Sequence, residues 1–329
     1  MTCVCVDAMG GDESPELVCE GIARALDADG ELSVLVAGDD KVVSPFCEAT
    51  DRATALVTTE VIGMGEHPAE AVRAKRDSSI VRGCKAVAAG EAEAFFSAGS
   101  TGAILTAATL NVGRVKGIKR PALAIALPGI DGHETAFVDL GANADCRPEM
   151  IVQFAQMGIA FAHVVLGCPD PKVALLSNGA EATKGNEATL AYHAALDAAD
   201  IGFVGNCEGC DLLMGDFDVI VCDGFCGNVA LKTIEGTAKF MAARLKAAAR
   251  QSPRSAMGGL LVKPAMAEVA SSLSGDYYGG ATLLGLKAPV LVGHGATNEE
   301  AIKNGTLAAA RVVRGGLVGK LTEACAIAS

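Results

Sequence analysis

The stretch Phe217-Asp-Val-Ile-Val-Cys-Asp-Gly-Phe-Cys-Gly-Asn-Val-Ala-Leu231 decides the fold of this chain. Residues 219–222 are short and apolar, as in a buried strand, and Asp223-Gly224 interrupts them. Gly227-Asn228 then begins a helix. The unpaired N–H groups of such a helix N-terminus suit an anion, and Lys232 can reach back toward it. The alternative is an ordinary α/β turn that binds nothing.

Turns of the same kind recur along the chain, each after a short apolar run. They are Asp7-Ala-Met-Gly-Gly-Asp12, Ala98-Gly-Ser-Thr-Gly-Ala103, Asp139-Leu-Gly-Ala-Asn143, Lys184-Gly-Asn-Glu187 and Gly293-His-Gly295. Strand and helix patterns alternate from end to end, which predicts an α/β protein. We expect a three-layer α/β/α, Rossmann-like architecture around a mostly parallel sheet, in a single domain over residues 1–329.

Ligands of such folds bind beyond the carboxyl ends of the strands. The residues expected at this one edge are Asp7, Gly99, Ser100, Asn143, Lys184, Asn186, Asn206, Asp223, Asn228 and His294. The turn at residues 98–103 lacks the Gly-Lys-Ser/Thr of a Walker motif and the spacing of a dinucleotide fingerprint. Neither kind of nucleotide site is therefore expected there.

Composition narrows the class of protein further. The 329 residues carry a net charge of −12, which disfavours a nucleic-acid binder. Residues 1–6 lead directly into a strand without a signal-peptide pattern, and no apolar run reaches the ~18 residues of a membrane span. We therefore expect a cytoplasmic protein.

The 12 cysteines fit that compartment as small apolar residues. A zinc site built from Cys207, Cys210, Cys222 and Cys226 is the less favoured alternative, because its flanks do not resemble a zinc ribbon. We expect no metal and no other cofactor.

One segment of this acidic chain is basic. Residues 236–267 contain six basic residues and no acidic one, and Ser252-Pro253 interrupts the helical pattern near their middle. This predicts a protruding helical segment, at about 236–275, that docks an anionic partner. The alternative is a solvated helix face. The Gly/Tyr-rich residues 275–286 that follow are expected to form a loop.

Eight motifs in series give a specific resemblance. They are Asp7-Ala-Met-Gly-Gly-Asp12, Ser97-Ala-Gly-Ser-Thr-Gly-Ala103, Asp139-Leu-Gly-Ala-Asn143, Lys184-Gly-Asn-Glu187, Asp223-Gly-Phe-Cys-Gly-Asn-Val-Ala-Leu-Lys232, Tyr278-Gly-Gly-Ala281, Leu284-Gly-Leu-Lys287 and His294-Gly295. In this order they closely resemble the PlsX family of bacterial acyl-[acyl-carrier-protein]–phosphate acyltransferases, from residue 1 to about 310. Three sites depart from the family pattern: Ser100 replaces Asn, Cys210 replaces a common Arg, and residues 294–298 differ from its His-Gly-Ser-Ser-Asp-like run.

The resemblance implies a reaction and a fold. Inorganic phosphate attacks the thioester of a long-chain acyl carrier protein, and acyl phosphate and free carrier protein form. A membrane glycerol-3-phosphate acyltransferase of the PlsY type then uses the product in phospholipid synthesis. The resemblance further implies a homodimer, a fold similar to phosphotransacetylases and isocitrate dehydrogenases, and peripheral association with the membrane.

The chemistry assigns expected roles to the motif residues. We expect a phosphate cradle at Gly10, Gly11, Gly99, Ser100, Thr101 and Gly102, with Lys184 supplying positive charge. Asn143, Asn186 and Asn228 are the candidate oxyanion donors, and His294 is the candidate proton donor to the leaving thiolate. For His294 the alternative is a loop histidine that caps a turn. Asp7, Asp139 and Asp223 are expected to position loops, since a carboxylate repels phosphate.

The basic segment gains a use from the same resemblance. Acyl carrier protein and the cytoplasmic leaflet are both anionic, so we expect Lys239, Arg244, Lys246, Arg250 and Arg254 to dock the carrier. Leu260 and Leu261 are expected to touch lipid, or alternatively to pack in a dimer interface. The main rival function is a small-acyl phosphotransacetylase that uses acyl-coenzyme A. An isocitrate-type dehydrogenase and a non-catalytic scaffold have less support.

Overall fold

A computed structural model describes residues 1–272, 279–295 and 298–326. One sheet of eleven strands runs through the molecule in the order β3-β2-β1-β4-β11-β10-β5-β6-β9-β7-β8. The strands are β1 (Thr2–Asp7), β2 (Leu32–Gly38), β3 (Ala53–Val57), β4 (Ala94–Ser97), β5 (Ala122–Pro128), β6 (Glu134–Val138), β7 (Val173–Leu176), β8 (Phe203–Cys207), β9 (Val219–Val221), β10 (Ala281–Leu284) and β11 (Val290–Val292). The predicted α/β class and the mostly parallel sheet are confirmed.

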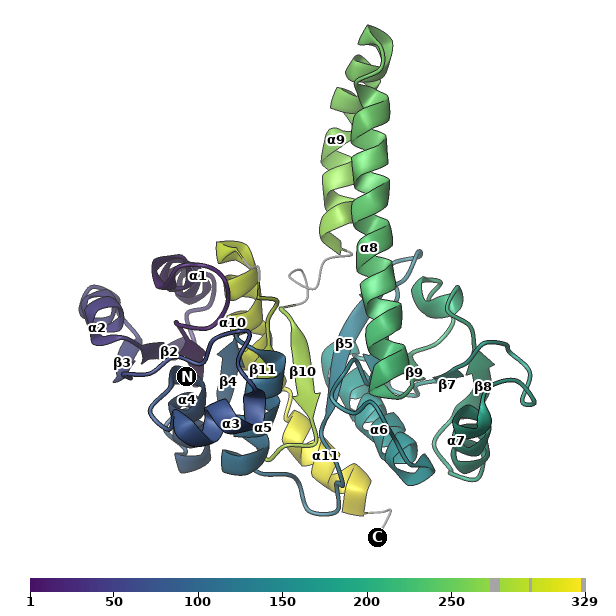
Figure 1. The fold of residues 1–329 in the computed structure, drawn as a ribbon, viewed down its shortest axis with the longest axis horizontal. Coiled ribbons are helices and arrows are strands. Elements are labelled where there is room, and N and C mark those ends of the chain that lie inside the picture. Colours follow the sequence, from purple (N-terminus) through teal and green to yellow (C-terminus); the bar gives the residue numbers. More distant parts are fainter. Residues whose placement is uncertain (273–278, 296–297, 327–329) are drawn as a thin grey trace.

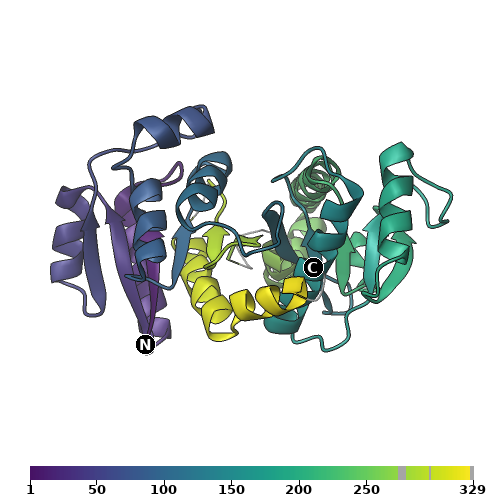
Figure 2. The same ribbon diagram turned by 90° about the horizontal axis from the view of Figure 1, so that it is seen from below.

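Helices cover both faces of the sheet, so the fold has the three layers that were predicted (Figures 1 and 2). They are α1 (Pro15–Ala28), α2 (Asp40–Glu48), α3 (Pro68–Ala74), α4 (Ser79–Ala89), α5 (Thr101–Asn111), α6 (Pro148–Phe161), α7 (Glu187–Asp197), α8 (Gly224–Ala249), α9 (Pro253–Ser272), α10 (Glu299–Arg314) and α11 (Leu317–Ala326). A π-helical turn, Ala162–Leu166, extends α6, and a 3-10 turn spans Asp211–Leu213.

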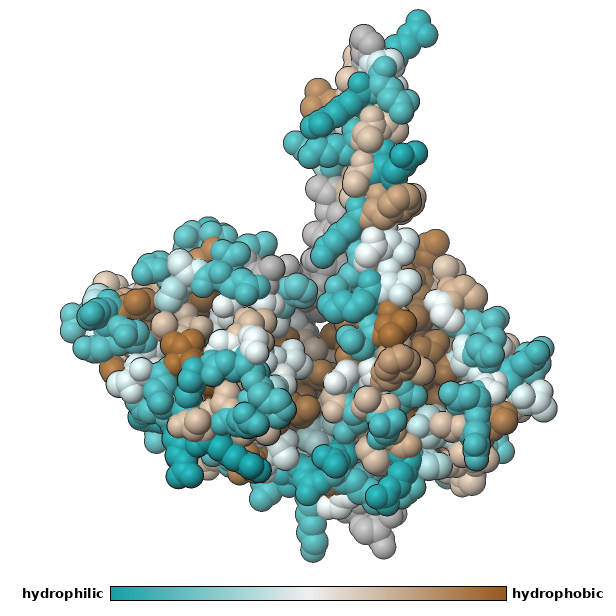
Figure 3. Space-filling model, viewed as in Figure 1, coloured by the Kyte–Doolittle hydropathy of each residue, from teal (hydrophilic) through white to brown (hydrophobic). Residues whose placement is uncertain are grey.

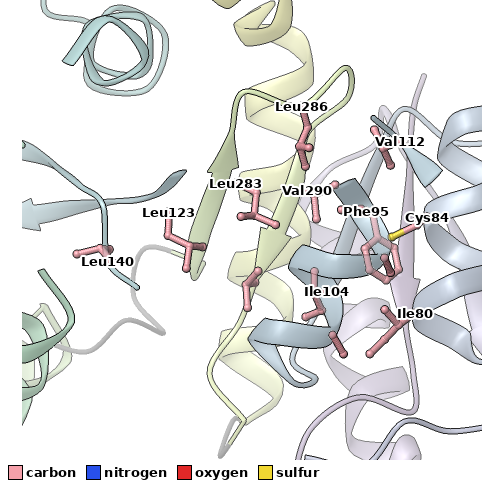
Figure 4. Packing of buried hydrophobic residues seen from close by; sticks show 14 of the residues in the cluster. Ile80, Cys84, Phe95, Ile104, Val112, Leu123, Leu140, Leu283, Leu286 and Val290 are labelled. Atoms are coloured by element: carbon pink, nitrogen blue, oxygen red, sulfur yellow. The ribbon is translucent and has the colours of Figure 1, made fainter. Parts of the chain in front are cut away.

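The core consists of apolar side chains that alternate between the two faces of these strands. On the face under α4 and α5, Phe95, Ile104 and Leu123 belong to one buried cluster that continues to Leu140 (Figure 4). On the other face, α1 and α10 pack over β1 and β2 through Ile22 and Ile302, and α6 packs over β6 and β9 through Phe154. The strands therefore form a rigid floor from which their terminal loops emerge.

The two halves of the sheet run in opposite directions. β10 pairs antiparallel with β11 and with β5, and β5 pairs antiparallel with β6, while the other neighbours are parallel. Three reversals leave β6, β9, β7 and β8 antiparallel to β1, β4 and β11. The expectation of one edge carrying every candidate residue was therefore wrong. Loops after β1, β4 and β11 leave one edge, and those after β6, β9 and β7 leave the opposite edge.

The antiparallel pairing of β5 with β6 explains that error, because the reversals on the two sides of β10 cancel and leave β5 parallel to β11. The sequence also missed one strand. Residues 281–284 were read as part of a loop, but they form β10 between β11 and β5. Gly279 and Gly280 both have positive φ, and the close approach of Gly280 to the Val292 carbonyl leaves no room for a side chain. These glycines allow a sharp turn directly before β10. Because β10 has only four residues and follows a glycine-rich stretch, its strand pattern is not recognisable in the sequence.

Helices α8 and α9 form a hairpin that projects from the body (Figure 1). The break predicted at Ser252-Pro253 separates the two helices. Gly259 of α9 packs closely against Ala249 of α8, where a Cβ on the glycine would lie 2.7 Å from the alanine Cβ. The start of α8 differs from expectation: the helix begins at Gly224, not at Gly227-Asn228, because Asp223 already caps it. Asn228 therefore lies inside the helix.

Within the described residues, one helical segment is long and apolar enough to cross a membrane, judged by length and composition alone. It runs from Pro148 to Leu166, has a mean hydropathy of 1.5, and is half buried inside the protein. Ile151 and Phe154, on its buried side, belong to the core cluster beneath the sheet. This burial is what the core helix of a folded domain shows as well.

Candidate functional site

Three glycine-containing loops are joined at the first edge of the sheet. The Ser97 hydroxyl donates to the Asp7 carboxylate at 2.7 Å and accepts from the Gly99 backbone N–H at 3.0 Å. The Asp12 N–H donates to the Gly295 carbonyl at 2.9 Å. A Cβ on Gly10 would lie 2.5 Å from the Asp7 carboxylate and 2.8 Å from the Gly99 nitrogen, so only glycine fits. The loops after β1, β4 and β11 thus form one compact unit.

Asp7, at the end of β1, connects these loops through hydrogen bonds. Its side chain is buried, and burial raises its pKa, although hydrogen bonds from Ser79 and Ser97 act in the opposite direction. Its carboxylate also accepts from the Met9 N–H at 2.9 Å. These bonds fit the predicted role of positioning loops rather than that of an acid or base in contact with substrate.

The N-terminus of α5 opens from this unit. Ser100 stands at its N-cap position and makes no side-chain cap hydrogen bond. In contrast, the Asp223 carboxylate accepts from the Cys226 N–H at the start of α8, and the Asn186 amide oxygen accepts from the Thr189 N–H at the start of α7. A capping carboxylate repels an anion, so the start of α5, where the phosphate cradle was predicted, offers phosphate a better site than the start of α8, where the sequence also suggested an anion.

A second cluster lies where β6 ends. Asp139 is fully buried and accepts four hydrogen bonds: from the Leu123 N–H, the Ala142 N–H, and the backbone and side-chain N–H groups of Asn143, at 2.8–3.1 Å. Burial raises the Asp139 pKa, against the effect of these bonds. The other hydrogen of the Asn143 amide goes to the Pro121 carbonyl at 2.8 Å. Both amide hydrogens of Asn143 are thus engaged, which speaks against oxyanion binding by this residue.

Helix α8 packs directly on this cluster. The Gly224 N–H donates to the Asn143 carbonyl at 2.7 Å, and a Cβ on Gly227 would lie only 1.9 Å from the Asp139 carbonyl oxygen. The Gly-Phe-Cys-Gly sequence at 224–227 therefore lets the first turn of α8 touch the loop after β6. This contact fixes where the following turns of α8 stand above the sheet.

Those turns form the wall of a pocket of about 320 Å³ between α8 and α5. Its floor is the length of β5, with Leu123, Ile125 and Leu127 among the apolar side chains. Its polar lining comes from Thr101 at the start of α5, His294 after β11, and Asn228, Lys232 and Glu235 on α8. Figure 3 shows the surface hollowed below the projecting hairpin of α8 and α9, the arm, between the two halves of the molecule. The pocket thus joins polar groups from both halves over an apolar floor.

Three of the predicted site residues line this pocket: Thr101, Asn228 and His294. The remaining cradle residues lie beside it: Gly10, Gly11, Gly99 and Ser100 belong to the loops, and Gly102 belongs to the first turn of α5. Lys184 and Asn186 do not line it: both are exposed on the loop after β7, where the Lys184 stem packs over Gly179. The roles assigned to all these residues stay predictions.

Several lining residues were not singled out from the sequence. Glu235 and the floor residues of β5 read only as helix and strand pattern, since nothing local marks them as facing a cavity. Lys232 was noted for reaching back to the α8 N-terminus, but it pairs instead with Glu235, at 2.8 Å from Nζ to Oε2. The spacing of Asn228, Lys232 and Glu235 was the available signal, because it places them on one helix face.

The cysteines near the pocket lie in buried surroundings that keep their thiols protonated. Cys222 is buried and donates to the Asp139 carbonyl at 3.6 Å, and burial raises its pKa well above that of a free thiol. Burial also raises the pKa of Cys226 to about 11. Within the described residues, no group of three or more His, Cys, Asp or Glu side chains is arranged to hold a metal ion.

Solved structures define the class of fold. A phosphotransacetylase from Streptococcus pyogenes matches with a TM-score of 0.60 and 16% identity, covering 100% of this chain and 95% of that one. A branched-chain phosphotransacylase from Enterococcus faecalis matches with a TM-score of 0.59 and 15% identity, covering 95% and 99%. A 4-hydroxythreonine-4-phosphate dehydrogenase from Klebsiella pneumoniae shares the fold at a TM-score of 0.53. The chain thus has the Rossmann-like fold of this group.

Sequence comparison then gives the family. Residues 2–320 match the profile described as "Fatty acid synthesis protein". A phosphate acyltransferase from Bacillus pumilus is 44% identical over 91% of this chain and 90% of its own length, and one from Limosilactobacillus reuteri is 42% identical over 97% and 95%. The chain belongs to the PlsX family of phosphate acyltransferases, and it is an acyltransferase.

Proposed function

We propose that this enzyme transfers a long-chain acyl group from acyl carrier protein to inorganic phosphate, and so supplies acyl phosphate for phospholipid synthesis. The observation that carries the proposal is the pocket. It places an apolar floor along β5 beside the uncapped N-terminus of α5 and the loops joined to it. An acyl chain suits the floor, and a phosphate dianion suits the helix N-terminus.

The chemistry needs no covalent enzyme intermediate. A phosphate oxygen attacks the thioester carbonyl carbon, a C–O bond forms, and the C–S bond breaks as sulfur leaves with the electron pair. Holding phosphate against the thioester converts two diffusing reactants into one oriented pair, which lowers the barrier by about 7–11 kcal/mol in favourable cases. The backbone N–H groups at the start of α5 and the Thr101 hydroxyl are the proposed phosphate ligands.

Two side chains in the pocket are proposed to act on the thioester. Asn228 carries an amide that can donate to the developing oxyanion, and loss of one such donor typically costs about 3–4 kcal/mol of transition-state stabilisation. His294, on the opposite wall, is the proposed donor of a proton to the departing sulfur. Asn143 is instead assigned to the support of the loop after β6, since both its amide hydrogens are engaged.

The arm is proposed to bring the carrier protein to the pocket. Lys239, Arg244, Lys246, Arg250 and Arg254 are all exposed on it. At 3.6 residues per turn, Lys239, Lys246 and Arg250 lie within about 40° of Lys232 around the axis of α8. They therefore continue, away from the body, the same helix face that lines the pocket. An acidic carrier bound along this stripe would have the pocket mouth directly below it.

The arm also carries the proposed membrane contact. Leu260 and Leu261 are exposed to 72% and 78%, next to the basic side chains of the same hairpin. Exposed leucines with flanking cations suit an anionic lipid surface. We propose that the enzyme is cytoplasmic, forms a homodimer, associates peripherally with the membrane, and passes acyl phosphate there to a glycerol-3-phosphate acyltransferase of the PlsY type.

The deciding experiment measures thioester loss from palmitoyl-acyl carrier protein and from palmitoyl-coenzyme A, each with and without inorganic phosphate. We expect phosphate-dependent loss from the carrier substrate, with acyl phosphate as the product, and little from coenzyme A. Phosphate-dependent loss from coenzyme A alone would assign the enzyme to the phosphotransacetylases. Absence of phosphate-dependent loss from both would refute the proposal.

A further inference from the structure

Helix α8 presents one face to the pocket. Asn228, Leu231, Lys232 and Glu235 all line it, and their spacings of three and four residues place them one above another on the helix. Thr101 and His294 line the opposite wall, at the edge where the phosphate loops emerge. Lys232 therefore stands across the same cavity from the proposed phosphate ligands.

The pocket holds very little charge. Among its lining residues, all of which lie in the described part of the chain, Lys232 is the single Lys or Arg and Glu235 is the single acid. An entering phosphate dianion, and the tetrahedral species that follows, needs positive charge in a cavity with an apolar floor. Lys232 is the ammonium group positioned to supply it.

The two charged side chains are paired with each other. The Lys232 Nζ lies 2.8 Å from Glu235 Oε2 and 3.1 Å from Oε1. The Glu235 side chain is only 18% exposed, whereas that of Lys232 is 53% exposed. The Glu235 side chain is thus largely covered, whereas about half of the Lys232 side chain is open to solvent. A pair in such a half-exposed setting is weak, so a doubly charged anion can compete for the lysine.

Lys184, the cation expected from the sequence, has a different setting. It is exposed on the loop after β7, which leaves the edge of the sheet opposite to the phosphate loops, and its stem packs over Gly179. It is not among the residues that line the pocket. The opposite direction of the two sheet halves therefore separates Lys184 from the start of α5.

We propose that Lys232 is the residue that binds the phosphate substrate through charge, and that Glu235 orients its ammonium group until phosphate enters. This inference rests on the proposed function, because it names a ligand of that same site. Glu235 is a positioning residue: it repels the incoming dianion and so sets how tightly phosphate binds. Lys232→Met removes the charge at nearly constant volume, and Lys232→Arg keeps it.

The test compares steady-state kinetics of these variants with palmitoyl-acyl carrier protein and inorganic phosphate. We expect Lys232→Met to raise the KM for phosphate at least tenfold, with the KM for the acyl carrier protein changed less than twofold. Lys232→Arg should retain most of the phosphate affinity. Lys303→Met is the matched control, because Lys303 also pairs with a glutamate three residues away, Glu300, but on α10, away from the pocket.

Glu235→Gln gives a readout of opposite sign. Removal of the repelling carboxylate should lower the KM for phosphate about two- to fivefold, whereas a merely structural pair would make this variant resemble Lys232→Met. An unchanged KM for phosphate in Lys232→Met would overturn the inference while wild-type activity, measured beside it, leaves the proposed function intact.

A binding measurement keeps the inference testable without turnover. Inorganic phosphate should raise the thermal unfolding midpoint of the wild-type enzyme, since it binds the folded state. The shift should be lost in Lys232→Met and kept in Lys303→Met. Equal phosphate stabilisation in both variants would count against Lys232, whatever their activities.

Discussion

Two glycines allow the close contacts that position the starts of α5 and α8 beside the pocket. Gly10 is in contact with Asp7, Ser97 and Gly99, and Gly227 is in contact with the Asp139 carbonyl. Neither position tolerates a Cβ without movement of backbone or of a buried carboxylate. The glycines were visible in the sequence as turn signals, but the partner across each contact was not, because it lies in a loop distant along the chain.

Gly227→Ala tests the contact between α8 and the loop after β6. The added Cβ would lie 1.9 Å from the Asp139 carbonyl oxygen, so the start of α8 must shift. We expect a loss of about 3 kcal/mol in the free energy of unfolding and a severe loss of activity. Gly236→Ala, later in the same helix with open space around it, should instead gain about 0.5–1 kcal/mol. Denaturant titration of both variants measures the difference, and equal stabilities would contradict the assigned contact.

At the scale of elements, the two ends of α8 lie in different surroundings. Its first turns seat on the Asp139 loop and line the pocket, and its last turns stand clear of the body in the arm (Figure 1). The sequence predicted the helix, its basic character and its end before Ser252-Pro253. It could not show that Asn228, Lys232 and Glu235 face a cavity, because that depends on the position of β5 under the helix.

The proposed docking of the carrier protein along Lys239, Lys246 and Arg250 of α8 gives a prediction at this scale. Lys239→Glu, Lys246→Glu and Arg250→Glu together should raise the KM for acyl carrier protein at least tenfold, because they reverse the charge of the exposed face above the pocket. The KM for phosphate should change little. The control reverses Lys41, Lys303 and Lys320 on other helices, which gives the same change in net charge. A similar rise in both triple variants would point to overall charge rather than docking.

A second prediction concerns how α10 is tied to the first strand. The Arg314 Nη1 donates to Asp29 Oδ2 at 2.7 Å and its Nε donates to the Thr2 hydroxyl at 3.0 Å. The hydrogen bond from Arg314 is the main cause of the lowered Asp29 pKa. Because the folded-state pKa is depressed, the pair stabilises the protein above the ordinary Asp pKa, and the effect disappears as the pH falls through the lower, folded value.

Arg314→Met should therefore lower the free energy of unfolding by about 1 kcal/mol at pH 7. The difference from wild type should persist down to about pH 4, the ordinary range of an Asp carboxyl, and shrink in more acidic solution. Urea titrations at a series of pH values measure it. A deficit that stays constant at pH 3 would assign the effect to packing or to the Thr2 hydrogen bond.

For the whole molecule, the direction of the two sheet halves matters most. Alternating patterns predicted the layers and the strands well, since each strand carries its own apolar signal. The strand β10 was missed because it has only four residues and follows Gly279 and Gly280. The change of direction between the halves comes from the antiparallel pairing of β5 with β6, and an apolar strand pattern does not show how a strand pairs. That reversal places Lys184 at the sheet edge opposite to the loops proposed to bind phosphate, whereas Lys232 of α8 lines the pocket over β5 and is the cation proposed in its place.

The arm projects from the body and carries the proposed contact with the membrane (Figure 1). Leu261→Asp places a charge at a side chain that is 78% exposed, so folding should be unaffected. We expect binding to phosphatidylglycerol-containing vesicles to fall at least tenfold, because an apolar anchor is lost and anionic lipid is repelled. Sedimentation with vesicles at low and physiological salt measures it.

Ile130→Asp is the matched control, since Ile130 is 81% exposed on the body between β5 and β6. It should leave vesicle binding unchanged. The alternative role of Leu261, packing against a second copy of the chain, predicts a different result: Leu261→Asp would then lower the molar mass measured by light scattering without lipid. An unchanged mass together with lost vesicle binding would assign the exposed leucines of α9 to the membrane, and the reverse pattern would assign them to the dimer.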